Sequence, residues 1–227
     1  MAISVRRKSL GVCAFLPMLF TCLAWAPAHA MSVFINEIHY DNTGGDTGEA
    51  VEIAGPAGTN LAGWSLVLYN GATGATYNTL NLSGLISDQS TTGFGTLSFS
   101  QPGIQNGAPD GLALVDATNN VIQFLSYEGS FIAVGGAANG LTSTDIGVSE
   151  PTTTAVGNSL QLTGTGTMYE DFTWAAVMPN TFGAVNTDQT FRVSTQQPVP
   201  EPSTLLLLGS GLTGLSIWHW KRKQHQR

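Results

Sequence analysis

Side chains that could supply oxygen ligands to a metal ion gather around one glycine-rich stretch, HYDNTGGDTGEAVE. A calcium ion takes six to eight oxygen ligands, and flexible acidic loops often provide them. The candidate calcium ligands are Glu37, Asp41, Asn42, Asp46, Glu49 and Glu52. Their spacing matches neither the helix–loop–helix calcium motif nor the G-G-x-G-x-D repeat. Because Asp, Asn and Gly also form ordinary turns, a plain polar loop is the alternative interpretation.

Residues for nucleophilic or acid–base catalysis are scarce between 31 and 198. His39 is the single histidine there, and no G-x-S-x-G turn accompanies it, which argues against a Ser-His-Asp arrangement. Both cysteines, Cys13 and Cys22, lie before residue 31. One histidine and no cysteine between 31 and 198 cannot form a zinc site of His and Cys ligands. Paired carboxylates, as in glycoside hydrolysis, remain an alternative, but the distance between two carboxylates cannot be derived from the sequence alone. We therefore predict no catalytic residue, no transition-metal site and no enzymatic activity.

The charge of the chain is divided unevenly. Between 31 and 198 there are fourteen acidic residues and one basic residue, Arg192, which gives a formal charge of −13. Phosphate binding depends on Lys and Arg side chains, so direct binding of nucleic acid by this region is not expected. Solubility and cation binding are the two remaining explanations for the acidity.

The N-terminus has the three parts of a secretory signal. A basic cluster at 6–8 precedes an apolar run at 10–25, and Ala28 and Ala30 supply the small residues before a cut. We predict a signal peptide at 1–30; an uncleaved membrane anchor and a lipoprotein signal are the alternatives.

The C-terminus reads as a spacer, a membrane helix and a basic tail. Residues 194–202 are polar and proline-rich, and 203–220 carry no charge. A helix over 203–220 would span roughly 27 Å, close to the ~30 Å of a bilayer core. Two tryptophans end it, and the basic tail at 221–227 would stay on the cytoplasmic side. The alternative is a buried C-terminal helix of the globular domain.

Short runs rich in β-branched and aromatic residues fill the region between, and Gly, Asn, Asp, Thr or Pro bounds each of them. No sustained helical period with caps is present there. Many short strands at this spacing predict an all-β fold, an immunoglobulin-like antiparallel sandwich over 31–193. A hairpin is expected with its turn at 116–120, and Trp64 and Trp174 are expected in the core. The predicted strands are 33–40, 49–55, 64–71, 111–116, 120–127, 159–164 and 171–176.

Val199-Pro200-Glu201-Pro202, the apolar run and the basic cluster together resemble the PEP-CTERM sorting signal of Gram-negative bacteria. In that family a membrane enzyme, exosortase, recognises the tripeptide and removes the tail. The resemblance implies that Pro200, Glu201 and Pro202 are processing residues, with exosortase as partner. Such proteins usually belong to biofilm or exopolysaccharide systems.

A second resemblance covers most of 33–191. Asn36-Glu37, Glu52 in EAVEI, LAGWSL around Trp64, DGLALVD and FLSYEGSF are similar to lamin-tail domains, immunoglobulin-like modules also found at the N-termini of some secreted bacterial nucleases. The chain ends where such a nuclease would begin its catalytic domain.

These observations predict an exported, non-catalytic protein that is anchored in the inner membrane before processing and then sorted to the cell surface or matrix. Its expected role is structural or adhesive within an exopolysaccharide layer, with calcium as a possible ligand. The alternatives are an accessory domain of a secreted nuclease system, or a surface protein that binds polysaccharide or ice through Thr-rich strands.

Overall fold

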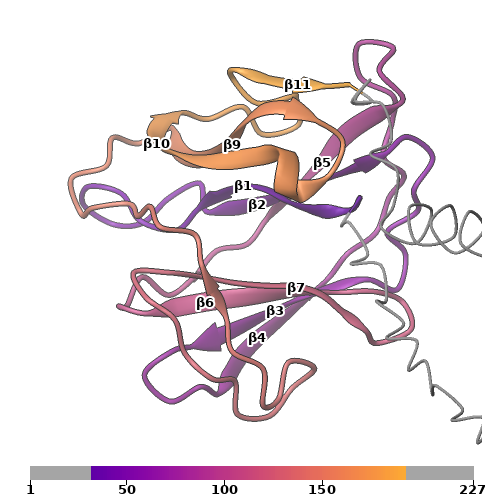
Figure 1. The fold of residues 1–227 in the computed structure, drawn as a ribbon. Helices are drawn as coiled ribbons and strands as arrows, with labels where there is room; N and C mark the ends of the chain where they lie inside the picture. The colour runs from indigo at the N-terminus through magenta and orange to yellow at the C-terminus, as the bar shows by residue number, and fades with distance from the viewer. Residues whose placement is uncertain (1–31, 193–227) are drawn as a thin grey trace, which may run out of the picture.

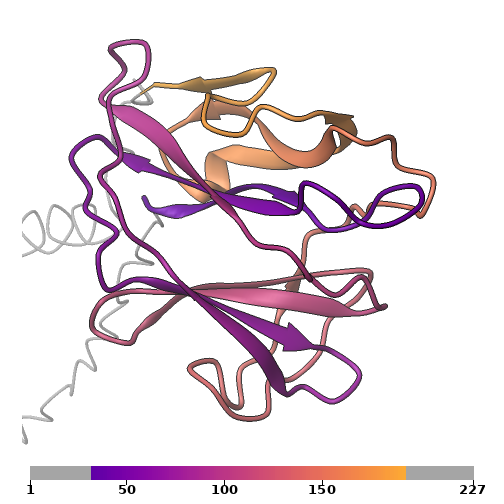
Figure 2. The same ribbon diagram turned by 180° about the vertical axis from the view of Figure 1, so that it is seen from behind.

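The computed structural model describes residues 32–192, which form two β-sheets packed face to face (Figure 1, and from behind in Figure 2). The first sheet consists of β1 (Phe34–His39), β2 (Ala50–Pro56), β5 (Phe94–Ser100), β9 (Asn158–Gly166), β10 (Phe172–Pro179) and β11 (Gln189–Phe191). The second sheet consists of β3 (Ser65–Asn70), β4 (Thr76–Asn81), β6 (Asp110–Val115), β7 (Val121–Tyr127) and β8 (Thr144–Asp145).

The strand order is β10-β9-β1-β2-β5 in the first sheet and β4-β3-β6-β7-β8 in the second. β11 pairs with β9 in parallel and β8 pairs with β7 in parallel, whereas the other strand pairs are antiparallel. The predicted immunoglobulin-like sandwich fits this architecture, with the correction that both sheets are mixed. Within the described residues the one helical element is a short 3₁₀ turn, η1 (Tyr169–Asp171).

All seven predicted strands are present, as β1, β2, β3, β6, β7, β9 and β10. The predicted hairpin is also confirmed: β6 and β7 are antiparallel, and the Asp116 carboxylate accepts hydrogen bonds from the main chain of Thr118 and Asn120 in the turn. Four strands were missed, β4, β5, β8 and β11. They are short or rich in Gly, Ser, Thr and Asn, so no apolar pattern marks them.

The main core lies between the sheets. Leu66 and Leu68 of β3 are fully buried in it, while the alternating Val67 and Tyr69 belong to a second cluster with Phe124. Trp174 is in the main core, and Trp64 packs against it from a half-buried position, as expected. Strand alternation therefore gives β3 an apolar face on each side of the second sheet.

Loop segments cover the outside of both sheets. Phe131, Ala133 and Ala138 complete the second cluster, so the segment 128–143 lies over the outer face of the second sheet. The segment 180–189, which we call the strap, bonds to Glu37 and Glu52 of the first sheet. Because these carboxylates alternate with core residues along their strands, they face away from the core and toward the strap.

A β-bulge in β1 shapes this outer face. Ile35 pairs with Ile53 and Glu37 with Glu52, so Asn36 is the extra residue on the bulged strand. The irregularity turns the Asn36 side chain toward Glu52 and toward Gln189 of β11. Through Asn36, the bulge therefore links β1, the first strand, to β11, the last strand of the described residues.

Candidate functional site

Two buried carboxylates face each other across β1 and β2. Glu37 and Glu52 are directly opposite in register, and both are fully buried. Both oxygens of Glu52 accept hydrogen bonds, one from the Asn36 amide at 2.9 Å and one from the Gly183 N–H at 2.6 Å. Each oxygen of Glu37 likewise accepts at least one bond, from Ser159 or Thr181. The protein's own donors thus occupy the oxygens that were predicted to bind calcium.

Amide side chains complete this network under the strap. Asn186 donates through its Nδ2 to the main-chain oxygens of Asn36, at 2.9 Å, and Leu162, at 3.0 Å. Its Oδ1 lies 3.1 Å from the Thr181 hydroxyl oxygen. Gln189 exchanges bonds with Asn36 at 2.6 and 3.2 Å. The network therefore binds three separated segments of the chain to one another.

Burial dominates the titration of this pair. It raises the pKa of Glu52 to about 8, and the neighbouring Glu37 charge adds to the rise, while bonds from Asn36 and Gly183 oppose it. Burial also raises the pKa of Glu37, against the lowering effect of its bonds from Ser159 and Thr181. At neutral pH the pair therefore holds at least one proton.

His39 belongs to a second buried cluster around Glu150. Its Nδ1 donates to Glu150 Oε1 at 2.9 Å, and Glu150 Oε2 accepts the main-chain N–H groups of Tyr40 and Asp41. Burial lowers the pKa of His39, but the hydrogen bond and charge of Glu150, together with the Thr47 oxygen and the Glu49 charge, outweigh it, and the net shift is upward. Nε2 lies 3.1 Å from the Thr47 oxygen and 2.9 Å from the Asn42 amide nitrogen. His39 is only 1% exposed, which fits a structural role better than proton exchange with a bound substrate.

The Tyr40 ring links this cluster to the second sheet. It stacks on Tyr127 of β7 with 3.8 Å between ring centroids and 11° between planes. The Tyr40 hydroxyl accepts the Glu150 N–H at 2.8 Å and donates to Glu128. Burial raises the pKa of Tyr40 far above its ordinary value, so the hydroxyl stays protonated and available as a donor.

The other four predicted calcium ligands lie on the loop between β1 and β2, apart from the Glu37–Glu52 pair. Asn42 and Glu49 are buried, and their Oδ1 and Oε1 atoms have no hydrogen-bond partner. Burial and the nearby Asp46 carboxyl raise the pKa of Asp41. Residues 32–192 nevertheless contain no group of three or more His, Cys, Asp or Glu side chains arranged to hold a metal. The structure therefore splits the predicted set in two, and calcium binding stays a prediction about the loop.

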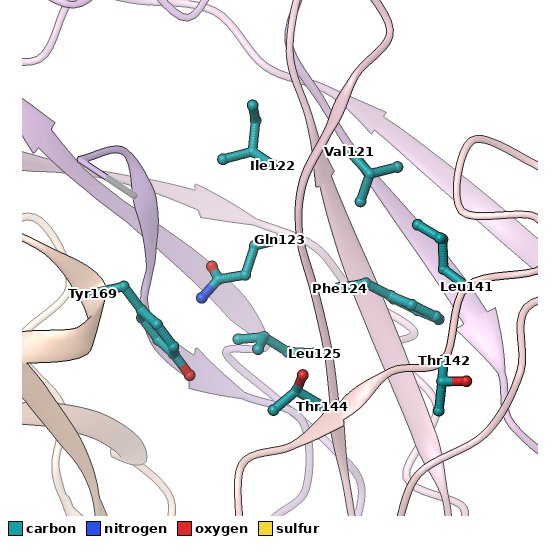
Figure 3. Close-up of a pocket in the computed structure, with 9 residues that line it drawn as sticks. All are labelled: Val121, Ile122, Gln123, Phe124, Leu125, Leu141, Thr142, Thr144 and Tyr169. Atoms are coloured by element: carbon teal, nitrogen blue, oxygen red, sulfur yellow. The ribbon is translucent and has the colours of Figure 1, made fainter. Parts of the chain in front are cut away.

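A groove of about 320 Å³ runs beside β7, in a place that the sequence did not indicate (Figure 3). Gln123, Leu125 and Tyr169 lie on one side of the strand, and Phe124, Leu141 and Thr142 lie on the other. Gln123 Oε1 accepts the Ile35 N–H at 2.9 Å, which leaves its buried Nε2 without a partner. Only the pairing of β7 and β8 reveals this groove, and no residue pattern in the sequence predicts it.

Several predicted features lie outside the described residues. These are the signal at 1–30, the linker at 194–202 with Pro200, Glu201 and Pro202, the helix at 203–220 and the basic tail. Within 32–192, no helix is long and apolar enough to span a membrane.

Comparison with known proteins identifies one feature. The family model of the PEP-CTERM protein-sorting motif matches residues 198–223. No curated protein and no solved structure matches the chain. The motif supports an exported protein that is held at the membrane and processed by exosortase before it is sorted to the surface.

Proposed function

We propose that this protein is an exported, non-catalytic β-sandwich of lamin-tail type that becomes a structural or adhesive component of an exopolysaccharide or biofilm layer once exosortase has removed its tail. The sorting motif at 198–223 carries the proposal, because it assigns the C-terminus to processing and leaves the sandwich as the part that reaches the surface. The described domain supports the non-catalytic role. Its one histidine and its two opposed carboxylates are buried and bonded to the protein itself.

Mass spectrometry of the protein recovered from its native cells tests the processing step. We expect a C-terminus within or just before Pro200–Pro202, and loss of the apolar run. Glu201→Ala should retain the tail and the membrane association, whereas the neighbouring Thr204→Ala should be processed normally. A full-length chain recovered with the inner membrane would contradict the proposal and indicate a tethered periplasmic protein.

The alternative, an accessory module of a secreted nuclease system, is favoured only by the lamin-tail resemblance. A domain with a formal charge of −13 repels polyanions, so neither DNA cleavage nor DNA retention at low salt is expected. Metal-dependent cleavage by the purified protein would overturn the non-catalytic assignment.

A further inference from the structure

The edge of β7 is only half paired. β6 pairs with β7 from Val121 to Tyr127, but on the other side β8 pairs only with Leu125 and Ser126. The chain before β8 turns away, because Ser143 and Ala133 bond to the segment opposite them: Ser143 N–H donates to the Phe131 oxygen and Ala133 N–H to the Leu141 oxygen, both at 2.9 Å. The stretch 121–124 therefore presents a strand edge without a neighbouring strand.

The groove described above runs along this open edge. Its two walls lie on opposite faces of the sheet, with Tyr169 on one side and Leu141 on the other (Figure 3). Leu141 is 46% exposed although it is apolar. A strand added beside 121–124 would place alternate side chains against the two walls and bond its main chain to the edge. The unpartnered Gln123 Nε2 supplies one further donor.

Charge decides which kind of strand fits. Asp145 and Glu170 are exposed and adjoin groove residues Thr144 and Tyr169, and the domain as a whole is strongly acidic. A second copy of this chain would bring the same charge of −13 to the contact and be repelled. A partner with Lys or Arg side chains would instead be attracted.

We propose that the β7 edge binds an extended, positively charged segment of a partner protein, which adds to the second sheet as a further strand. This proposal deepens the proposed adhesive role. It rests on that role because the partner protein would be encountered at the cell surface or in the matrix. Binding itself does not depend on processing of the tail, so the two proposals can fail separately.

The test measures binding of a labelled eight-residue peptide, in which Lys and Val alternate, to the full chain by fluorescence anisotropy. Leu141→Arg should weaken binding at least tenfold, because it places a positive charge in the groove wall. Leu85→Arg is the matched control, since it adds the same charge at an exposed residue outside the groove. It should change the affinity less than twofold.

Two altered peptides test the proposal with the unaltered protein. Methylation of alternate main-chain nitrogens should abolish binding, because an added strand needs those donors, and replacement of Lys by Glu should abolish it through repulsion. Equal binding of the methylated peptide, equal weakening by both Arg variants, or no binding at 1 mM peptide would each overturn the proposal. So would binding of a neutral glucan oligosaccharide that Leu141→Arg removes, because the groove would then be a polysaccharide site.

Discussion

Buried polar groups on the outer face of the first sheet are hydrogen-bonded within the protein, whereas some of those along β7 have no partner. Under the strap, Glu37, Glu52 and Asn186 find partners within the protein. Along β7, the buried Gln123 Nε2 and Ser126 Oγ have no hydrogen-bond partner, and four residues of strand edge are free of a neighbouring strand. Buried polar groups cost free energy unless they form hydrogen bonds. The bonds under the strap therefore stabilise the fold, whereas the β7 edge keeps hydrogen-bonding groups that a partner could use.

The largest expected effect is a loss of stability with rising pH, which originates under the strap. Since the folded pKa of Glu52 is about 8 and its ordinary value is 4.5, the folded state binds more protons than the unfolded state between these values. The free energy of unfolding should therefore fall from pH 5 to pH 9, by roughly 3–4 kcal/mol from Glu52 alone. The upward shifts at Glu37 and His39 act in the same direction.

Urea unfolding of the full chain at pH 5, 7 and 9 measures this slope. Glu52→Gln removes the titrating group and should flatten it, whereas the exposed Glu170→Gln should leave it unchanged. Stability that rises toward pH 9 would show that the pair is ionised in the folded protein.

Removal of Asn186 should open the strap. Asn186→Ala deprives the main-chain oxygens of Asn36 and Leu162 of a hydrogen-bond donor. Buried groups left unpaired cost about 1–3 kcal/mol each, and partial access of water reduces the total, so we expect a loss of about 2–3 kcal/mol. Thermal unfolding measures it, with exposed Asn180→Ala as a control that should cost under about 0.5 kcal/mol. An equal loss in both variants would mean that the network does not hold the strap.

The strands of the core could be read from the sequence because alternation along one strand is local information. Leu66 and Val67, neighbours on β3, illustrate this, since they fall into separate apolar clusters. The polar networks could not be read, because their members come from distant segments: Glu150 meets Tyr40 across 110 residues, and Asn186 meets Asn36 across 150. Glu37 and Glu52 were predicted as calcium ligands, yet their position on paired strands directs them to donors of the strap.

Calcium provides a third test, at the loop between β1 and β2, where Asn42 and Glu49 also have unpartnered buried oxygens. If this loop binds calcium in the weak extracellular range, millimolar Ca²⁺ should stabilise the full chain by about 1 kcal/mol, or a few degrees in melting temperature. Asp41→Asn should remove the shift, and Asp88→Asn, at an exposed turn elsewhere, should preserve it. A melting curve unaffected by Ca²⁺ would identify the stretch as a plain polar loop.

The smallest effect is expected at the groove wall, and there a near-zero result is informative. Leu141 is 46% exposed and belongs to neither apolar cluster, so Leu141→Ser should change the free energy of unfolding by less than about 0.5 kcal/mol. Thermal melts of this variant and of Leu85→Ser, measured side by side, should coincide with the unaltered chain. Such a near-zero cost would mean that the apolar Leu141 side chain beside the unpaired strand edge is not needed for folding, which leaves it available for contact with a partner. A loss of stability above about 1.5 kcal/mol would instead show that Leu141 is needed for folding. The β7 edge would then be covered by the protein's own chain, as the outer face of the first sheet is covered by the strap.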